Sequence, residues 1–215
     1  MAGIPFRKIP AAEMNTLLTT TYFGPVQWYQ KLYRSQVTEI EACESFLKQT
    51  YRNRCIIATT QGQQALTVPV ERGTSPLIRD IRISDHGAWR HLHWNALQSA
   101  YGESPFFEYY QDDIRPFFEK RWTYLFDMNE DIRAKICELI DIEPVITYTK
   151  EFKGEVDADG TKDFRYSIRP KNPADDPEFC PKEYYQVYQQ KHGFLPNLSV
   201  LDLLFNMGPE SIYYI

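Results

Sequence analysis

Lysine, arginine and asparagine side chains gather most densely between residues 48 and 55, where the sequence reads Lys-Gln-Thr-Tyr-Arg-Asn-Arg-Cys. If this stretch opens a strand, Arg52 and Arg54 share one face and Asn53 points to the other. Two guanidinium groups side by side suit a phosphate or a carboxylate, because each can form two parallel hydrogen bonds with such an anion. One interpretation of the segment is therefore an anion-binding site, with Lys48 as a further cation.

The same arginines have a second interpretation that involves no ligand. Like charges placed close together are unfavourable unless an anion or an acidic side chain neutralises them. Glu39, Glu41 and Glu44 lie on the preceding segment and are available as internal partners. An Arg–Glu network that only stabilises the fold is the simpler interpretation of the residues alone.

Three histidines follow the spacing H-x4-H-x-H at His86, His91 and His93. On a helix His91 and His93 lie about 200° apart, so they cannot chelate one metal ion together. His93 comes four residues after Trp89 and lies beside an apolar stripe. A packed, hydrogen-bonded core histidine is the ordinary interpretation of such a position. The alternative is a general acid or base at the mouth of a pocket.

The acidic loop at residues 155–163, Glu-Val-Asp-Ala-Asp-Gly-Thr-Lys-Asp, partly imitates a calcium-binding loop. Its position 12 would be Tyr166, where such a loop requires a bidentate glutamate. Asp157 and Asp159 also have the D-x-D spacing with which many glycosyltransferases hold a metal and a nucleotide diphosphate. A solvated hairpin tip explains these acids more simply, and we predict no metal site.

Common motifs for nucleophilic catalysis and nucleotide binding do not occur, since the chain has no G-x-S-x-G, no P-loop and no G-x-G-x-x-G. The sequence therefore leaves the cofactor unidentified. Four widely spaced cysteines without a C-x-x-C pair predict neither a disulfide scaffold nor a zinc knuckle. A reduced, cytoplasmic compartment fits this cysteine usage.

The composition is that of an ordered globular protein. Of the 215 residues, 43% are hydrophobic and 15% are aromatic, which argues against disorder. The charge count of 24 Lys and Arg against 29 Asp and Glu gives a net charge of -5, which disfavours a nucleic-acid partner. The chain has no run of about 18 apolar residues, so we predict no transmembrane segment.

Hydrophobic periodicity and turn residues divide the chain into expected elements. The predicted strands are 16–23, 37–42, 54–60, 64–70, 77–84, 145–152 and 163–169. Predicted helices are 26–34, 87–101, a segment after Pro105 that Pro116 divides, 130–141 with Asn129 as its cap, and 200–207 with Ser199 as its cap.

These elements predict one domain over residues 1–215, of the α+β or α/β class. We expect a mixed sheet from the strands before residue 84, a helical middle, and a C-terminal strand pair with a short helix. Residues near Arg52, Asn53 and Arg54 should face a pocket shared with His93.

Four segments together resemble the WbqC-like family. The matching features are a Y-F-x-P element, an R-N-R after a strand, L-T-V-P-V, a W…H…Y helix region followed by S-P-F-F, and a closing L-S-x-x-D-L-L-F-N-x-G. In this chain the four segments are residues 20–32, 48–57 together with 66–70, 89–110 and 194–211. The resemblance covers about four fifths of the chain, all but roughly 142–180, and is closest to the compact version of the family found in the Bacteroidetes.

The resemblance implies a role in O-antigen, surface-polysaccharide or related envelope biosynthesis. An acyl, aminoacyl or glycosyl transfer to a sugar intermediate is the activity that it suggests. The implied ligand is an anionic small molecule, either a nucleotide sugar or an acyl donor. With the residue chemistry above, it makes His93 the predicted catalytic base. The predicted substrate-binding residues are Tyr22, Lys48, Arg52, Asn53, Arg54, Trp89, Asp202 and Asn206.

One segment departs from the family pattern. Many members carry a Y-x-S-G…Y-L element after the helical middle, whereas residues 144–168 here contain no S-G element. This departure favours the alternative that the protein binds a ligand of the same pathway, or assembles with an envelope-biosynthesis partner or a second copy of itself, without catalysis.

Overall fold

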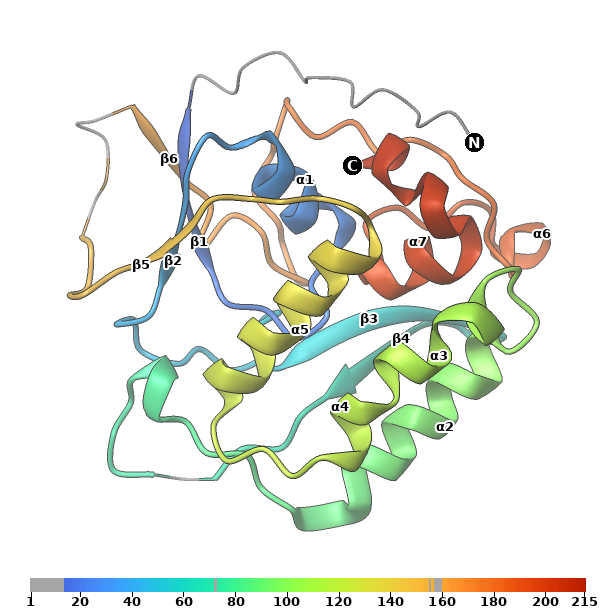
Figure 1. The fold of residues 1–215 in the computed structure, drawn as a ribbon, viewed down its shortest axis with the longest axis horizontal. Coiled ribbons are helices and arrows are strands. Elements are labelled where there is room, and N and C mark those ends of the chain that lie inside the picture. The colour runs from blue at the N-terminus through green and yellow to red at the C-terminus, as the bar shows by residue number, and fades with distance from the viewer. Residues whose placement is uncertain (1–13, 72, 155, 157–159) are drawn as a thin grey trace, which may run out of the picture.

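The computed structural model describes residues 14–71, 73–154, 156 and 160–215 (Figure 1). The strands are β1 Asn15–Thr19, β2 Thr38–Glu41, β3 Arg54–Thr59, β4 Gly62–Thr67, β5 Ile146–Tyr148 and β6 Thr161–Asp163. The helices are α1 Val26–Arg34, α2 Trp89–Tyr101, α3 Phe107–Ile114, α4 Pro116–Glu119, α5 Leu125–Leu139, α6 Gln189–His192 and α7 Val200–Met207. The predicted class, α+β or α/β, is confirmed.

A four-stranded parallel sheet in the order β5-β2-β1-β6 forms one side of the molecule. In register, Leu17 of β1 faces Glu39 of β2 on one side and Asp163 of β6 on the other. After its first residue, β1 is buried throughout, as a central parallel strand must be when both of its faces are covered. The chain thus places its first strand between its second and its last.

The sheet is built from different strands than expected. Residues 145–152 and 163–169 were expected to pair with each other, but β5 and β6 lie on opposite edges of the parallel sheet. The predicted mixed sheet is also wrong, because β3 and β4 form a separate antiparallel pair. Strand periodicity cannot distinguish these arrangements, since the partners of a strand are set by tertiary packing.

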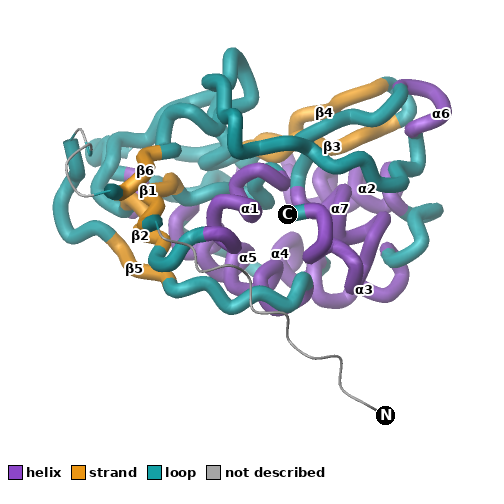
Figure 2. Tube along the Cα trace, turned by 90° about the horizontal axis from the view of Figure 1, so that it is seen from above, coloured by secondary structure: helices purple, strands orange, loops and turns teal. Residues whose placement is uncertain are grey.

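The β3–β4 hairpin was predicted, and its turn is tighter than expected. Thr59 pairs with Gly62, so two residues make the connection, and Gly62 has a φ of 99°. Such a positive φ is the backbone state that a tight hairpin turn requires and that glycine adopts easily. Figure 2 shows this hairpin and helices α2 and α7 away from the parallel sheet.

Three local predictions are wrong. Of the predicted strand 163–169 only Asp163 lies in a strand, at the end of β6, and residues 165–167 form a turn. Residues 77–84 form a short 3-10 turn at Ile78–Asp80 and isolated bridges instead of a strand. Helix α5 begins at Leu125, so Asn129 lies inside it and is no cap. The Asn129 side chain donates to the Arg52 carbonyl at 2.8 Å, a tertiary contact that its sequence neighbours do not reveal.

Helix α7 ends at the glycine of the closing motif. Ser199 caps the helix as predicted, because its hydroxyl accepts from the Leu201 amide. Gly208 has a φ of 54°, and a Cβ at this position would approach the Phe106 ring to within 2.5 Å. Both the backbone angle and the close ring require glycine here.

Replacing Gly208 tests this explanation. We expect Gly208→Ala to lower the free energy of unfolding by about 2–5 kcal/mol, because the costs of a strained φ and of an overlap with Phe106 add. Gly62→Ala is the matched control, since it has a positive φ but nothing within 4 Å of its Cβ. It should cost about 1–2 kcal/mol. Equal losses in denaturant titrations would mean that the Phe106 contact does not matter.

Candidate functional site

The carboxyl end of the parallel sheet is the place where open α/β proteins usually bind ligands. Here two buried ion pairs occupy it. Glu44, after β2, pairs with Arg52, and Glu41 at the end of β2 pairs with Arg165. The Tyr166 ring lies 5.8 Å from the Arg52 guanidinium and 5.4 Å from that of Arg165. Protein side chains therefore already neutralise both guanidinium groups.

Arg52 is held especially tightly. Its Nε donates to Glu44 Oε1 at 2.8 Å, its Nη2 donates to Oε2, and the Thr19 hydroxyl donates to the same carboxylate. The side chains of Arg52 and Glu44 are 2% and 0% exposed. The internal Arg–Glu pair that the sequence offered as an alternative is thus present, with Glu44 as the partner. A substrate-binding role for Arg52 stays a prediction. It would require the ligand to replace Glu44 as the partner of the guanidinium group.

The neighbours of Arg52 in the R-N-R motif have different partners. Asn53 Nδ2 donates to the Val68 carbonyl, and the Val68 amide donates to the Asn53 carbonyl, both at 2.8 Å. Arg54 is half-buried, and its Nε donates to the Thr67 hydroxyl at 3.0 Å. Arg52 and Arg54 therefore do not act on one shared anion in this structure. Lys48 lies exposed on the preceding turn.

The buried ion pair can be tested by a double-mutant cycle. We expect Arg52→Met to lower the free energy of unfolding by about 3–5 kcal/mol, because it leaves the Glu44 carboxylate buried without a counter-charge. The double variant Arg52→Met/Glu44→Leu should regain much of this loss. Denaturant titrations of the wild type, the two single variants Arg52→Met and Glu44→Leu, and the double variant measure the coupling. A double variant that is as unstable as Arg52→Met would show that Glu44 is not the important partner.

Three segments that carry family motifs meet at His93. Tyr22, in the turn after β1, and Trp89, one helical turn before His93 on α2, both contact its ring. The Tyr22 hydroxyl lies 2.9 Å from His93 Nδ1, and the Trp89 and imidazole centroids are 5.2 Å apart, edge to face. Thr67, at the end of β4, bonds the ring through its backbone. Thr67 thus lies between His93 and Arg54.

The surroundings of His93 keep it neutral. The side chain is 6% exposed, and burial lowers the pKa of the imidazole to about 4, although the bond to the Thr67 backbone partly offsets this. Burial also raises the pKa of Tyr22 well above its usual value. Tyr22 is therefore a hydroxyl donor at neutral pH, and the Nδ1 of a neutral ring that donates to a carbonyl accepts from it. The Nδ1 atom is thus engaged within the protein by Tyr22.

Asp202 and Asn206 lie on α7, at the other end of α2 from His93. Asp202 Oδ2 accepts from the Tyr184 hydroxyl at 2.7 Å and from Gln186 Nε2 at 2.8 Å. Burial raises the pKa of this carboxyl to about 6, with hydrogen bonds from Tyr184, Gln186 and Tyr101 opposing the rise. Asn206 donates back to the Asp202 carbonyl at 2.7 Å. The structure thus does not bring these two residues to His93, and their substrate-binding role stays a prediction.

The buried Asp202 predicts an unusual pH dependence. Its pKa is about 6 in the folded chain and about 3.9 when unfolded. The folded protein binds more protons at Asp202 between these values, so the contribution of Asp202 to stability is greatest below pH 4 and is lost as the pH rises through 6. In the wild type this lowers the free energy of unfolding by up to about 3 kcal/mol as the pH rises, and Asp202→Asn should remove that decline.

Denaturant titrations of wild type and Asp202→Asn from pH 4.5 to 7.5 measure this effect. The difference between the two proteins isolates Asp202, because the other carboxylates are common to both. A difference that does not change with pH would contradict the raised pKa.

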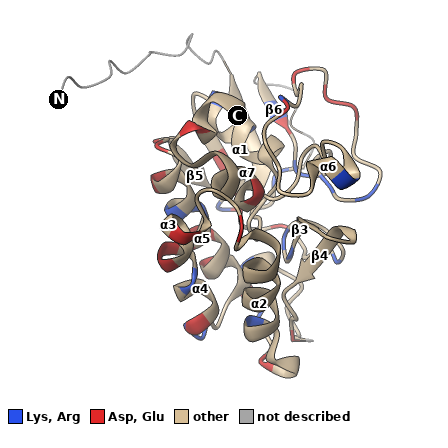
Figure 3. Cartoon of the chain, turned by 90° about the vertical axis from the view of Figure 1, so that its right-hand side faces the viewer, with Lys and Arg blue, Asp and Glu red and all other residues tan. Residues whose placement is uncertain are grey.

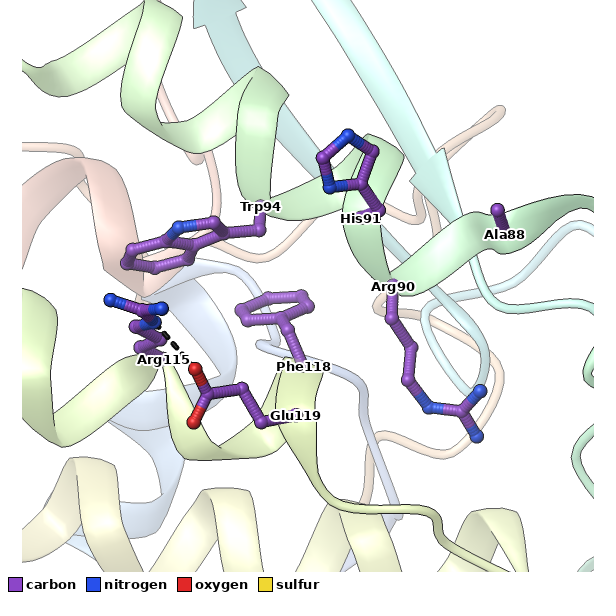
Figure 4. A pocket seen from close by; sticks show the side chains of 7 residues that line it. All are labelled: Ala88, Arg90, His91, Trp94, Arg115, Phe118 and Glu119. Atoms are coloured by element: carbon purple, nitrogen blue, oxygen red, sulfur yellow. Dashed lines mark hydrogen bonds and ion pairs between the residues drawn. The ribbon is translucent and has the colours of Figure 1, made fainter.

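A cavity of about 320 Å³ opens beside this cluster, on the outer side of α2 (Figure 4). Its lining side chains are Arg90, His91, Trp94, Arg115, Phe118 and Glu119. Phe118 joins the cavity to the His93 cluster, because its ring centroid is 6.5 Å from His93 and 5.7 Å from Trp94. Sequence reasoning missed these residues. The signal that could have found Arg90 and Trp94 is that each directly follows a residue of the W…H motif. Phe118 lies on α4, and only the tertiary fold brings it to the cavity.

Other candidate chemistry is limited within the described residues. No group of three or more His, Cys, Asp or Glu side chains that could hold a metal ion occurs there. Asp157 and Asp159 of the acidic loop lie outside the described residues. Cys43, Cys55 and Cys137 are buried, and burial raises the pKa of Cys137 to about 12, so its thiol is not a reactive thiolate at neutral pH. No helix in the described part of the chain is long and apolar enough to span a membrane.

Comparison with known proteins identifies the family. The sequence profile of the WbqC-like protein family matches residues 20–167 and 176–214, so the chain belongs to this family. The match includes most of the segment after residue 142, which the motif resemblance did not cover. The chain is 28% identical over 196 residues to the uncharacterized protein Rv1507c of Mycobacterium tuberculosis, across 79% of this chain and 83% of the relative. No solved structure matches the chain significantly.

Proposed function

We propose that this WbqC-like protein is a transferase of O-antigen, surface-polysaccharide or envelope biosynthesis. It binds an anionic donor, a nucleotide sugar or an acyl donor, and passes an acyl, aminoacyl or glycosyl group to a sugar intermediate. Its proposed setting is the cytoplasm, with a second copy or an envelope-biosynthesis protein as the partner. The observation that carries the proposal is the meeting of three motif-bearing segments at His93, beside a cationic and aromatic cavity.

The hydrogen bonds define how His93 would act as a base. Its Nδ1 is occupied by the Tyr22 hydroxyl, so an acceptor hydroxyl or amine passes its proton to the Tyr22 oxygen while the Tyr22 proton moves to Nδ1. With a pKa of about 4 the ring is neutral and able to accept, but it is a weak base. An anionic donor bound nearby raises the pKa, because the negative charge stabilises the imidazolium.

The test combines a donor screen with two conservative variants. Wild type, His93→Gln and Tyr22→Phe are incubated with nucleotide sugars and acyl-CoAs plus sugar acceptors, and products are followed by mass spectrometry. We expect turnover in the wild type and a loss of about 10²–10⁴-fold in His93→Gln, the usual contribution of a general base. Tyr22→Phe should lose at least tenfold while the fold loses only about 1 kcal/mol.

His86→Gln is the matched control, because His86 is exposed and precedes α2. It should retain full turnover and stability. A wild-type protein that binds a donor without consuming it, or a His93→Gln protein that turns over normally, would refute the catalytic role.

The second candidate function is a non-catalytic ligand-binding or assembly protein of the same pathway. Two observations favour it: His93 is buried with its Nδ1 bonded to Tyr22, and Arg52 is neutralised by Glu44. In this case donor binding occurs without product, and His93→Gln loses stability with no separate loss of function. The same screen distinguishes the two candidates.

A further inference from the structure

The cavity beside α2 combines positive charge with an incompletely paired arginine. Arg90 Nη1 donates to Asp85 at 2.6 Å, and its guanidinium lies 4.7 Å from the Trp89 ring centroid. Its Nε and Nη2 are buried and have no hydrogen-bond partner among the described residues. Because these atoms are not exposed, they do not face the open cavity, and Figure 4 shows the Arg90 guanidinium pointing away from Phe118 and Trp94. Arg90 therefore forms part of the wall, and the ligand contact must come from elsewhere.

The second arginine of the cavity is easily released from its present partner. Arg115 Nε contacts Glu119 at 2.6 Å, but the two side chains are 55% and 58% exposed. Exposed pairs one helical turn apart contribute little, because water competes for both charges. A phosphate can therefore replace the Glu119 carboxylate at Arg115 and form two parallel hydrogen bonds with the guanidinium. Figure 4 shows Arg115 and Arg90 on either side of Phe118.

The aromatic side of the cavity is held rigidly. Trp94 is half-buried, and its ring lies 6.0 Å from Phe107 in a stacked arrangement and 5.7 Å from Phe118. An indole fixed by two phenyl rings offers a preformed surface for a flat ring, which costs little conformational entropy on binding.

Charge around the cavity differs from that of the whole chain. The net charge of the chain is -5, yet Lys120 and Arg121 follow α4 directly, and Arg121 lies 3.6 Å from the Asp85 that also binds Arg90. Arg90 lies on α2, and Arg115 and Lys120 flank α4, whose own charged residue is Glu119; Figure 3 shows both blue and red residues around α4. A local concentration of cations on an acidic protein favours a specific anionic ligand over general polyanion binding.

We propose that this cavity binds the nucleoside diphosphate group of the donor, with Arg115 on the phosphates and Trp94 against the base. The inference rests on the proposed function for the identity of the ligand, since nucleotide sugars and coenzyme A both contain this group. The volume of about 320 Å³ lies at the lower end of the range for small-molecule sites. A nucleoside diphosphate fills such a cavity while the rest of the donor extends outward.

Calorimetric titration with UDP, ADP and inorganic phosphate tests the site in the full chain. We expect UDP or ADP to bind, with the preferred base distinguishing a nucleotide sugar from coenzyme A as the source. Arg115→Gln should weaken nucleotide binding at least tenfold. Trp94→Leu should weaken nucleotide binding but not phosphate binding. Glu119→Gln should tighten binding severalfold, because it removes the carboxylate that competes for Arg115.

Arg82→Gln is the matched control, because Arg82 is likewise exposed and paired with a glutamate, Glu71, at 3.5 Å. It should bind nucleotides like the wild type. Thermal melts of each variant confirm folding, and Arg115→Gln is expected to melt like the wild type since its ion pair is solvated. Equal affinity in Arg115→Gln and wild type, or no nucleotide binding at millimolar concentration, would overturn the cavity as the donor site.

These outcomes separate the cavity from the proposed function. A wild type that turns over a donor, with the same KM in Arg115→Gln, overturns the cavity and leaves the transferase role intact. Nucleotide binding that depends on Arg115 without any turnover supports the cavity and refutes the transferase role.

Discussion

The buried pair of Arg52 and Glu44 is the interaction on which most of the structure depends. It neutralises two charges that would otherwise be costly inside the protein, and it ties the carboxyl end of the parallel sheet to the start of the β3–β4 hairpin. The backbone carbonyls of Tyr51 and Arg52 add further hydrogen bonds between these elements. The Tyr51 carbonyl accepts from the Tyr22 amide, and the Arg52 carbonyl accepts from Asn129 of α5. One short segment thus joins the sheet, the hairpin and the central helix.

Much of the family pattern therefore serves architecture. The asparagine of the R-N-R motif holds the end of β4 through Val68, and the serine of the closing motif caps α7 and donates to the Phe23 carbonyl at 2.8 Å. Gly208 is required by its backbone angle and by the Phe106 ring. A motif residue that is buried and hydrogen-bonded within the protein stabilises the fold whether or not it also contacts a ligand. The cluster around His93 differs because an open cavity lies beside it.

The class of the fold could be read from the sequence, but the pairing of its strands could not. The helix over residues 26–34, the hairpin and the capped helix at 200–207 all follow from local periodicity, turn residues and caps. The insertion of β1 between β2 and β6 joins segments more than 100 residues apart. No local signal encodes such a contact, because the residues that stabilise it are near only after folding. The same reason explains Asn129, which reads as a cap but bonds a distant carbonyl.

Sequence alone identified the family, the two possible roles of Arg52 and Arg54, and His93 as a candidate catalytic residue. All three depend on residue types and their spacing. Tertiary structure decided which partner each arginine has: Glu44 neutralises Arg52, whereas Arg54 donates to the Thr67 hydroxyl. It also decided that Tyr22, 71 residues away, bonds His93, and that α2 and α4 enclose a cationic cavity. Burial and hydrogen-bond partners set the charge state of a side chain, and both exist only in the folded chain.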